Sequence, residues 1–373
     1  MQKKLIALAI AGLAAAPAFA ADNVTIYGIL DEGLVFSGGD SGKVTNTKSR
    51  HALDNGVLSP SRLGFKGAED LGNGIKAIFE IETGLQMDRA NAGTTVGQAG
   101  GLFSTSRHSY MGLTGGFGTF VAGRLDGARY ANYAKYDQSG AGTARNIASM
   151  VNQTDRADNA MAYISPSFSG FSVLLAYSAN AGLTGLSAGT TDEGVGNVGD
   201  GRLLTAQLNY DNGPLSASLD HEEIEQQKLA APLKYKTSNV GALYDFGVAK
   251  VGLFYDKNTL DVPGARLVDY NVWIASVSAP VGANAKVFFS YGSVDDKTVA
   301  NQDGRKWGIG AQYNMSKRTT LYTDFGQINN RNNGGYVMQL AGNAGAVPGL
   351  QAASNGTANY GVRALDLGIR HSF

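Results

Sequence analysis

Histidines and clustered charges are the side chains with which this chain could do chemistry. The sequence holds four histidines and no cysteine. A hydrolase could pair His108 with Ser109, but neighbouring residues of a strand point to opposite faces and cannot meet in that way. Without cysteine there is no thiol nucleophile, thiolate metal site or disulfide. We therefore expect no enzyme, no catalytic residue and no cofactor.

A glycine-rich stretch offers oxygen ligands that could hold calcium. It contains Asp192, Glu193 and Asp200, and Ca²⁺ prefers carboxylate and carbonyl oxygens. The spacing is not that of an EF-hand, so an exposed loop is the better interpretation. No metal site is expected from the sequence.

Other charged residues fall at every second position of segments in which apolar residues fill the positions between. Arg62 and Lys66 flank Leu63 and Phe65 in this way. Because the side chains of a strand point alternately to its two faces, these charges collect on one face. The charges placed on this face are Arg62, Lys66, Lys76, Glu80, Glu82, Arg107, Asp126, Arg156 and Asp158.

The same period of two recurs along the whole chain and predicts many antiparallel strands. Residues 204–210, 287–292 and 306–313 each have one apolar face and one mixed or polar face. Sixteen such segments begin near Val24, Ser61, Gly74, Ser106, Gly118, Ala157, Phe171, Arg202, Pro214, Lys236, Val248, Asp269, Asn284, Arg305, Arg318 and Tyr360.

The links between these segments alternate in length. Short links include residues 115–117, 165–170, 211–213 and 314–317, whereas long links include 37–60, 86–105, 126–156, 180–201 and 329–359. Short turns at one end and long loops at the other are typical of barrels in bacterial outer membranes.

The first twenty residues form an export signal. Lys3 and Lys4 precede an apolar run from Leu5 to Ala16, and Ala18-Phe19-Ala20 is a small-x-small site with cleavage expected before Ala21. Residues 1–20 are thus a signal peptide and residues 21–373 one barrel domain. Removing the two lysines leaves 29 basic and 31 acidic residues, a net charge of −2 that argues against a nucleic-acid partner.

A closed membrane barrel accounts for the two-faced strands better than a soluble sandwich does. No mature segment has 18 consecutive apolar residues, so spanning helices are excluded, and a closed barrel also pairs every backbone group. The segments run about ten residues, enough to cross a bilayer when tilted. Charge on the lipid face would cost about 2–4 kcal/mol for arginine or lysine at mid-depth. The charged face is therefore expected to line the lumen.

Four segments resemble the Gram-negative general porins, in their β-proteobacterial branch. They are Val24 to Gly28, Ser61 to Gly72, Arg156 to Pro166 and Gly368 to Phe373. The sixteen segments predict a sixteen-stranded antiparallel barrel. The resemblance implies a homotrimer of such water-filled barrels, each narrowed by an inward-folded third loop. It also implies an arginine cluster of Arg62, Arg107 and Arg156 on the pore wall, with Glu82 among the opposing acids. Rim salt bridges are the alternative for these arginines.

Several finer expectations follow within this architecture. The third loop, residues 126–156, is expected to set some of its charges opposite the arginines. Met111 and Leu113 would point inward with Arg107 and pack beneath that loop, while Arg124 could face lipid or the loop. The second loop would brace a neighbouring subunit. Phe373 would be the assembly signal read by the barrel-assembly machinery in a membrane of lipid and lipopolysaccharide.

The expected function is passive diffusion of ions and small hydrophilic solutes, with modest anion preference. One alternative is a channel specific for an organic acid, phosphate or sugar; a sugar channel would need lumen aromatics, of which Phe288 and Tyr322 are the best candidates. An adhesin or autotransporter barrel and a soluble secreted β-protein are further alternatives. Localisation in the bacterial outer membrane follows from the export signal and the barrel.

Overall fold

The computed structural model describes most of the chain from residue 24 onward. The described residues are 24–40, 49–88, 103–139, 142, 144–150, 156–181, 200–226, 232–338 and 361–373. The expected signal peptide, most of the second loop, Asp155 and the acidic pair Asp192 and Glu193 lie outside these ranges.

Strands dominate the described residues, with one short α-helix and one 3₁₀ turn. The elements are β1 (Thr25–Gly38), β2 (Arg50–Asn55), β3 (Arg62–Gly72), β4 (Ile75–Leu85), β5 (Phe103–Gly115), β6 (Gly118–Asp126), α1 (Ala128–Tyr136), η1 (Ile147–Met150), β7 (Arg156–Ile164), β8 (Phe171–Ser178), β9 (Asp200–Asn212), β10 (Leu215–Gln226), β11 (Leu233–Asp245), β12 (Lys250–Val262), β13 (Ala265–Val281), β14 (Ala285–Asp296), β15 (Gln302–Asn314), β16 (Thr319–Asn332) and β17 (Arg363–Ser372).

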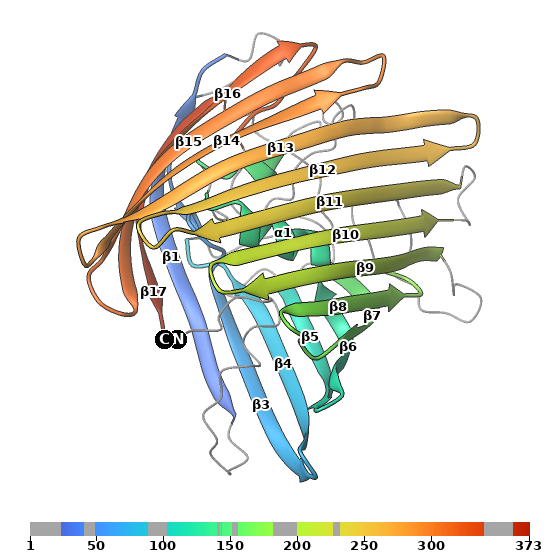
Figure 1. Ribbon diagram of the computed structural model, residues 1–373. Coiled ribbons are helices and arrows are strands. Elements are labelled where there is room, and N and C mark those ends of the chain that lie inside the picture. Colours follow the sequence, from blue (N-terminus) through green and yellow to red (C-terminus); the bar gives the residue numbers. More distant parts are fainter. Residues whose placement is uncertain are drawn as a thin grey trace.

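These strands close into a sixteen-stranded antiparallel barrel, as the alternation predicts (Figure 1). β1 closes the ring by pairing with β17 along Ile29–Gly38. On its other edge β1 pairs with β3 near its start and with β2 nearer its end, so β2 and β3 share one position in the ring. β2 corrects one expectation, because it lies within residues 37–60, which had been predicted as a loop.

A buried aspartate explains why the second strand is broken between β2 and β3. Asp31 is fully buried, and its carboxylate accepts hydrogen bonds from the backbone N–H groups of Leu58 and Ser59 at 3.2 and 3.0 Å. The Tyr322 hydroxyl donates to the same carboxylate at 2.8 Å. These bonds satisfy backbone donors that the interrupted ladder leaves without strand partners.

The barrel wall has apolar side chains outside and polar ones inside. On β17, Leu365, Leu367 and Ile369 are 42–46% exposed, whereas Asp366 between them is fully buried. A soluble β-protein would show the reverse arrangement, since its apolar face covers a core. No helix among the described residues is long and apolar enough to cross a membrane.

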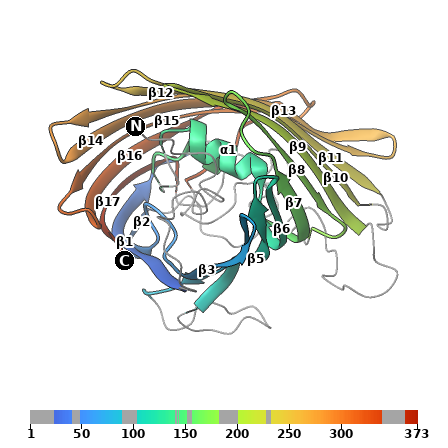
Figure 2. The ribbon, with the colours of Figure 1, turned by 60° about the horizontal axis from the view of Figure 1, so that its bottom comes forward.

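The third link of the chain folds into the barrel, as expected (Figure 2). Its first part forms α1, which begins after Gly127 and ends before Asp137. α1 lies inside the ring and contacts β10, β11 and β12, and η1 contacts β14 and β15. Polar side chains of α1 contact polar side chains of the wall, so hydrogen bonds connect the two. The lumen is thereby narrowed on the side of β9 to β16.

Candidate constriction site

Two acidic residues of β4 and a bulge in β5 build the centre of the site. Glu80 and Glu82 lie two positions apart and share the inward face, with 8% and 3% of their surface exposed. The β4–β5 register shifts between Ile81 and Thr83, so Arg107 and His108 both lie opposite Glu82. A bulge of this kind can turn two consecutive side chains to one face. Both residues are buried, at 6% exposure each.

The bulge overturns the expectation for the rest of β5. Met111 and Leu113 had been placed inward with Arg107, but they are 69% and 42% exposed and lie on the outer face. Tyr110 points inward instead and is 6% exposed. Strict alternation fails here because the extra residue shifts the face on which Arg107 lies relative to the rest of the strand.

Two arginines share the carboxylate of Glu82. The Nε atom of Arg107 donates to Glu82 Oε1, and Nη1 of Arg62 lies 3.8 Å from the same oxygen. The Arg62 side chain is 20% exposed and also donates to the backbone oxygen of Pro60 at 3.0 Å. Two positive groups therefore face one negative group, which leaves local positive charge at this point of the wall.

Glu80 collects hydrogen bonds from aromatic hydroxyls and an imidazole. The hydroxyls of Tyr27 and Tyr110 both donate to it, the latter at 2.8 Å, and Nε2 of His108 lies 3.1 Å from its Oε1. Lys66 pairs with Glu80 in the β3–β4 register, and its ammonium lies 5.2 Å from the centre of the Tyr27 ring.

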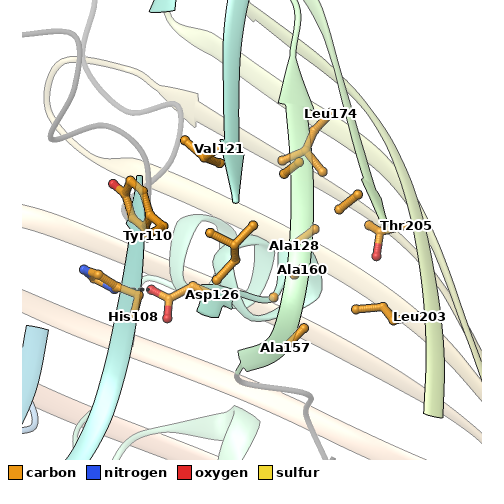
Figure 3. A pocket seen from close by; sticks show the side chains of 14 residues that line it. His108, Tyr110, Val121, Asp126, Ala128, Ala157, Ala160, Leu174, Leu203 and Thr205 are labelled. Carbon is orange, nitrogen blue, oxygen red and sulfur yellow. Dashed lines mark hydrogen bonds and ion pairs between the residues drawn. The ribbon is translucent and has the colours of Figure 1, made fainter. Parts of the chain in front are cut away.

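Asp126, at the start of the third loop, joins this network from the other side (Figure 3). Its Oδ2 lies 3.2 Å from Nδ1 of His108, and its Oδ1 lies 2.9 Å from Nε of Arg156. His108 is thus held between two carboxylates, those of Asp126 and Glu80. The structure brings together seven of the nine residues that the sequence placed on the inward face.

Lys76 and Asp158 lie apart from this cluster. Lys76 is exposed beside the Asn73–Gly74 turn, four residues and hence roughly 13 Å along the strand from Glu80. Asp158 corrects the expectation of an inward carboxylate: it forms an ion pair with Arg124. Arg124 pairs in register with Ser109 on the outer face that it shares with exposed Phe120.

Local backbone geometry explains the placement of Asp158. The β6–β7 register shifts between Gly123 and Leu125, and Asn159 has a φ of +51°. Asp158 and Asn159 together lie opposite Arg124, so simple counting from Arg156 assigns the wrong face. The pair also settles Arg124, for which the sequence left two placements open.

Most charges of the third loop bind the opposite wall and do not face the arginines. Arg129 of α1 and Asp256 of β12 form an ion pair at 2.6 Å, and neither side chain has exposed surface. The Tyr133 hydroxyl donates to Asp256 at 2.8 Å. Burial by itself lowers the pKa of Arg129, but the Asp256 carboxylate raises that pKa well above its usual value. Arg129 therefore stays charged and anchors α1.

The second half of the loop is anchored in the same way. Nε of Arg145 lies 2.7 Å from Asp324, with 2% and 0% of the side chains exposed. The backbone N–H of Ala144 donates to Asp366 at 3.0 Å. Lys135 pairs with Asp211 at 2.8 Å. The expectation that several loop charges oppose the arginine cluster thus holds, among the described loop residues, for Asp126 alone.

The two candidate lumen aromatics both contact neighbouring side chains and are buried. Phe288 is 9% exposed, and the Arg145 guanidinium lies 3.9 Å from its ring centre. Tyr322 is 4% exposed and donates to Asp31. Neither presents a free ring on which a sugar could slide.

Tyr27, Tyr110, His108 and Arg370 belong to the site but are not among the residues that the sequence placed there. For His108 the sequence excluded a pairing with Ser109 and suggested no other role. Arg370 lies on the inward face of β17, two positions beyond Gly368 and four beyond Asp366, and acts electrostatically on both Arg62 and Asp31. Alternation along β17 would have revealed Arg370, whereas the position of His108 depends on the bulge.

Known proteins with similar sequences include outer membrane porins. The model of the Gram-negative porin family matches residues 7–333. Outer membrane porin protein 32 of Delftia acidovorans is 32% identical, and the match covers 100% of both chains.

Solved structures show the same architecture. The anion-selective porin from Comamonas acidovorans is 28% identical and superposes with a TM-score of 0.76 over 95% of this chain and 100% of that one. A trimer form of OmpT from Vibrio cholerae, at 16% identity, superposes with a TM-score of 0.66 over 95% and 100%; it shows the shared fold. Family and fold point to a channel and not to an enzyme. The chain therefore belongs to the Gram-negative porin family and is a channel-forming β-barrel of the bacterial outer membrane.

Proposed function

We propose that this porin is a diffusion channel for ions and small hydrophilic solutes with a modest preference for anions. The observation that carries the preference is the sharing of Glu82 by Arg62 and Arg107. The constriction would lie between these arginines and α1, whose Tyr130 acts electrostatically on both. Fixed charges at a narrow point of a pore bias ions by sign.

The local balance of charge supports this direction. The cluster holds five basic side chains and three carboxylates; they are Arg62, Lys66, Arg107, Arg156 and Arg370 against Glu80, Glu82 and Asp126. The whole mature chain has the opposite sign, but charges beyond about 8 Å are largely screened at physiological salt. The similar Comamonas porin, described as anion-selective, supports the same direction.

Charge reversal of Arg62 tests the proposal. In planar bilayers under a salt gradient, Arg62→Glu should move the zero-current potential toward cation preference. Arg266→Glu is the matched control, because Arg266 is an exposed arginine paired with Asp261 and Asp269 far from the cluster. Cation preference of the unaltered channel together with a silent Arg62→Glu would refute the assignment.

We propose that the chain assembles as a homotrimer and that the second loop, residues 86–105, braces a neighbouring subunit. The support is the family and a similar fold solved in a trimer form. Crosslinking in native membranes should give trimers, and shortening the loop should weaken them. Monomers alone from the unaltered protein would contradict the proposal.

We infer that Phe373 is the terminal signal for insertion by the barrel-assembly machinery into a membrane of lipid and lipopolysaccharide. Phe373 is 42% exposed, as is expected for the face that Ile369 shares by alternation, and its ring packs where a side chain on Gly28 would lie. Deleting Phe373 should lower the folded yield while export continues. Export itself would use residues 1–20 as a cleaved signal, so mass spectrometry of the mature protein should find Ala21 first.

A further inference from the structure

Glu80, Glu82 and His108 form a cluster of metal-binding side chains within the barrel wall. One ligand atom from each residue lies within 4.8 Å of the other two, and all three side chains are buried. Two neighbouring strands supply them: β4 gives the carboxylates, and the β5 bulge gives the imidazole. The barrel scaffold thus fixes all three on one small patch of the inward face.

The position of Asp126 is a second and independent feature of a metal site. Its carboxylate lies 3.2 Å from Nδ1 of His108, while Nε2 points to Glu80 at 3.1 Å. Histidines that bind metals usually donate their other N–H to a carboxylate, which fixes the tautomer and orients the ring. With Nδ1–H donated to Asp126, the lone pair of Nε2 is directed toward Glu80.

A small cavity adjoins the cluster on the side of His108 and Asp126. A cavity of about 40 Å³ adjoins His108 and Asp126 and is otherwise lined largely by small apolar residues such as Ala157 and Ala160 (Figure 3). About 10–15 Å³ is enough for one water molecule. A water there would lie beside His108 and Asp126, and neither Glu80 nor Glu82 lines the cavity.

We propose that Glu80, Glu82 and His108 bind a divalent ion of the zinc class, with Asp126 orienting His108. One imidazole and two carboxylates suit Zn²⁺, whereas Mg²⁺ and Ca²⁺ prefer oxygen ligands alone. In a tetrahedral site the ligand atoms are roughly 3.3 Å apart. Nε2 of His108 and Oε1 of Glu80 already lie 3.1 Å apart, and no pair of ligand atoms is more than 4.8 Å apart, so only Glu82 has to move closer, by about 1.5 Å at most. The ion takes the place of any proton on Nε2 and competes with Arg107 for Glu82.

Binding would link metal to the charge pattern of the pore. The positive charge of Arg107 is paired with the Glu82 carboxylate. A metal bound to Glu82 would free the Arg107 guanidinium to act on ions in the lumen. The inference does not depend on the direction of ion preference, because it is tested by metal binding and not by current.

Titration of the folded, detergent-extracted porin with Zn²⁺ tests the site. We expect saturable binding of one ion per chain, absent with Mg²⁺, and at least a tenfold loss of affinity in His108→Gln. His221→Gln is the matched control, since His221 is an exposed strand histidine that contacts Ser238, and it should bind as the unaltered protein does. No saturable binding, or unchanged affinity in His108→Gln, overturns the proposal.

X-ray absorption at the zinc edge keeps the test decisive if His108→Gln does not fold. The unaltered protein should show one histidine nitrogen with oxygen ligands, and an all-oxygen or multi-histidine shell would overturn the site. Asp126→Asn should weaken binding by about 10–100-fold while the single-histidine spectrum persists, since its role is to position His108. Unchanged affinity in Asp126→Asn would remove Asp126 from the proposal.

Discussion

The two sides of the lumen use the same residue types in different ways. On the side of β12 to β16, Arg129 and Arg145 are 0% and 2% exposed, and each has a carboxylate of its own. On the other side Arg62 is 20% exposed and shares Glu82 with Arg107. A buried arginine that pairs with a carboxylate of its own stabilises the fold. A partly exposed arginine that shares its carboxylate with another arginine keeps positive charge available to passing ions.

Breaking one of the buried ion pairs that hold the third loop should have the largest effect on stability. Asp256→Asn leaves the Arg129 guanidinium buried without its counter-charge, and it should lower the free energy of unfolding by about 3–5 kcal/mol. Urea unfolding in detergent measures this. The double variant Arg129→Met with Asp256→Leu should recover much of the loss, because no charge then remains buried. A loss below about 1 kcal/mol in Asp256→Asn would show that α1 is held by other contacts.

Close packing of the loop on its wall predicts the next largest effect. A Cβ on Gly252 would lie 1.9 Å from the backbone oxygen of Tyr136, so Gly252→Ala should push α1 from the wall and cost about 1–3 kcal/mol. Gly116→Ala is the control, since nothing lies within 4 Å of a Cβ there. Equal unfolding curves for the two variants would mean that the loop moves freely on this wall.

The arginine wall should respond in selectivity and hardly in stability. Arg62→Gln leaves Glu82 paired with Arg107, so the free energy of unfolding should change by about 1 kcal/mol or less. The zero-current potential should still shift toward cations, by less than in Arg62→Glu. A large loss of stability with unchanged selectivity would reverse the roles assigned to the two walls.

An exposed pair at the turn between β11 and β12 sets the lower limit. Lys250 lies 3.0 Å from Asp245 near a turn, and their side chains are 37% and 40% exposed. Lys250→Ala should change stability by less than about 1 kcal/mol and leave the zero-current potential in place. Any shift in that potential would mean that charge distant from the arginines also sets selectivity.

Local patterns were enough to predict the barrel but not its interruptions. The predicted starts at Gly118 and Phe171 coincide with β6 and β8, because turn glycines and alternation are properties of neighbouring residues. β2 was missed because its separation from β3 depends on Asp31. Asp31 lies on another strand, and its bonds to residues 58 and 59 form only once β1 has paired with β2 and β3.

The candidate constriction site could be predicted only as far as alternation holds. Glu80 and Glu82 lie where counting along β4 places them, and Arg62 follows from β3 in the same way. Asp158 was assigned to the wrong face, because the bulge opposite Arg124 breaks the count. A bulge is a mismatch between two strands, so one strand's sequence does not reveal it.

Sequence alone determined that the wall has an apolar outside and a polar inside, since the face of a side chain follows from its position in a strand of period two. Tertiary structure decided which charges meet. Arg129 finds Asp256 across 127 residues, and His108 joins Glu80 through a register shift. Such contacts depend on strand register and on the path of the third loop within the closed ring. Those are set by the packing of the whole barrel and not by any local stretch of residues.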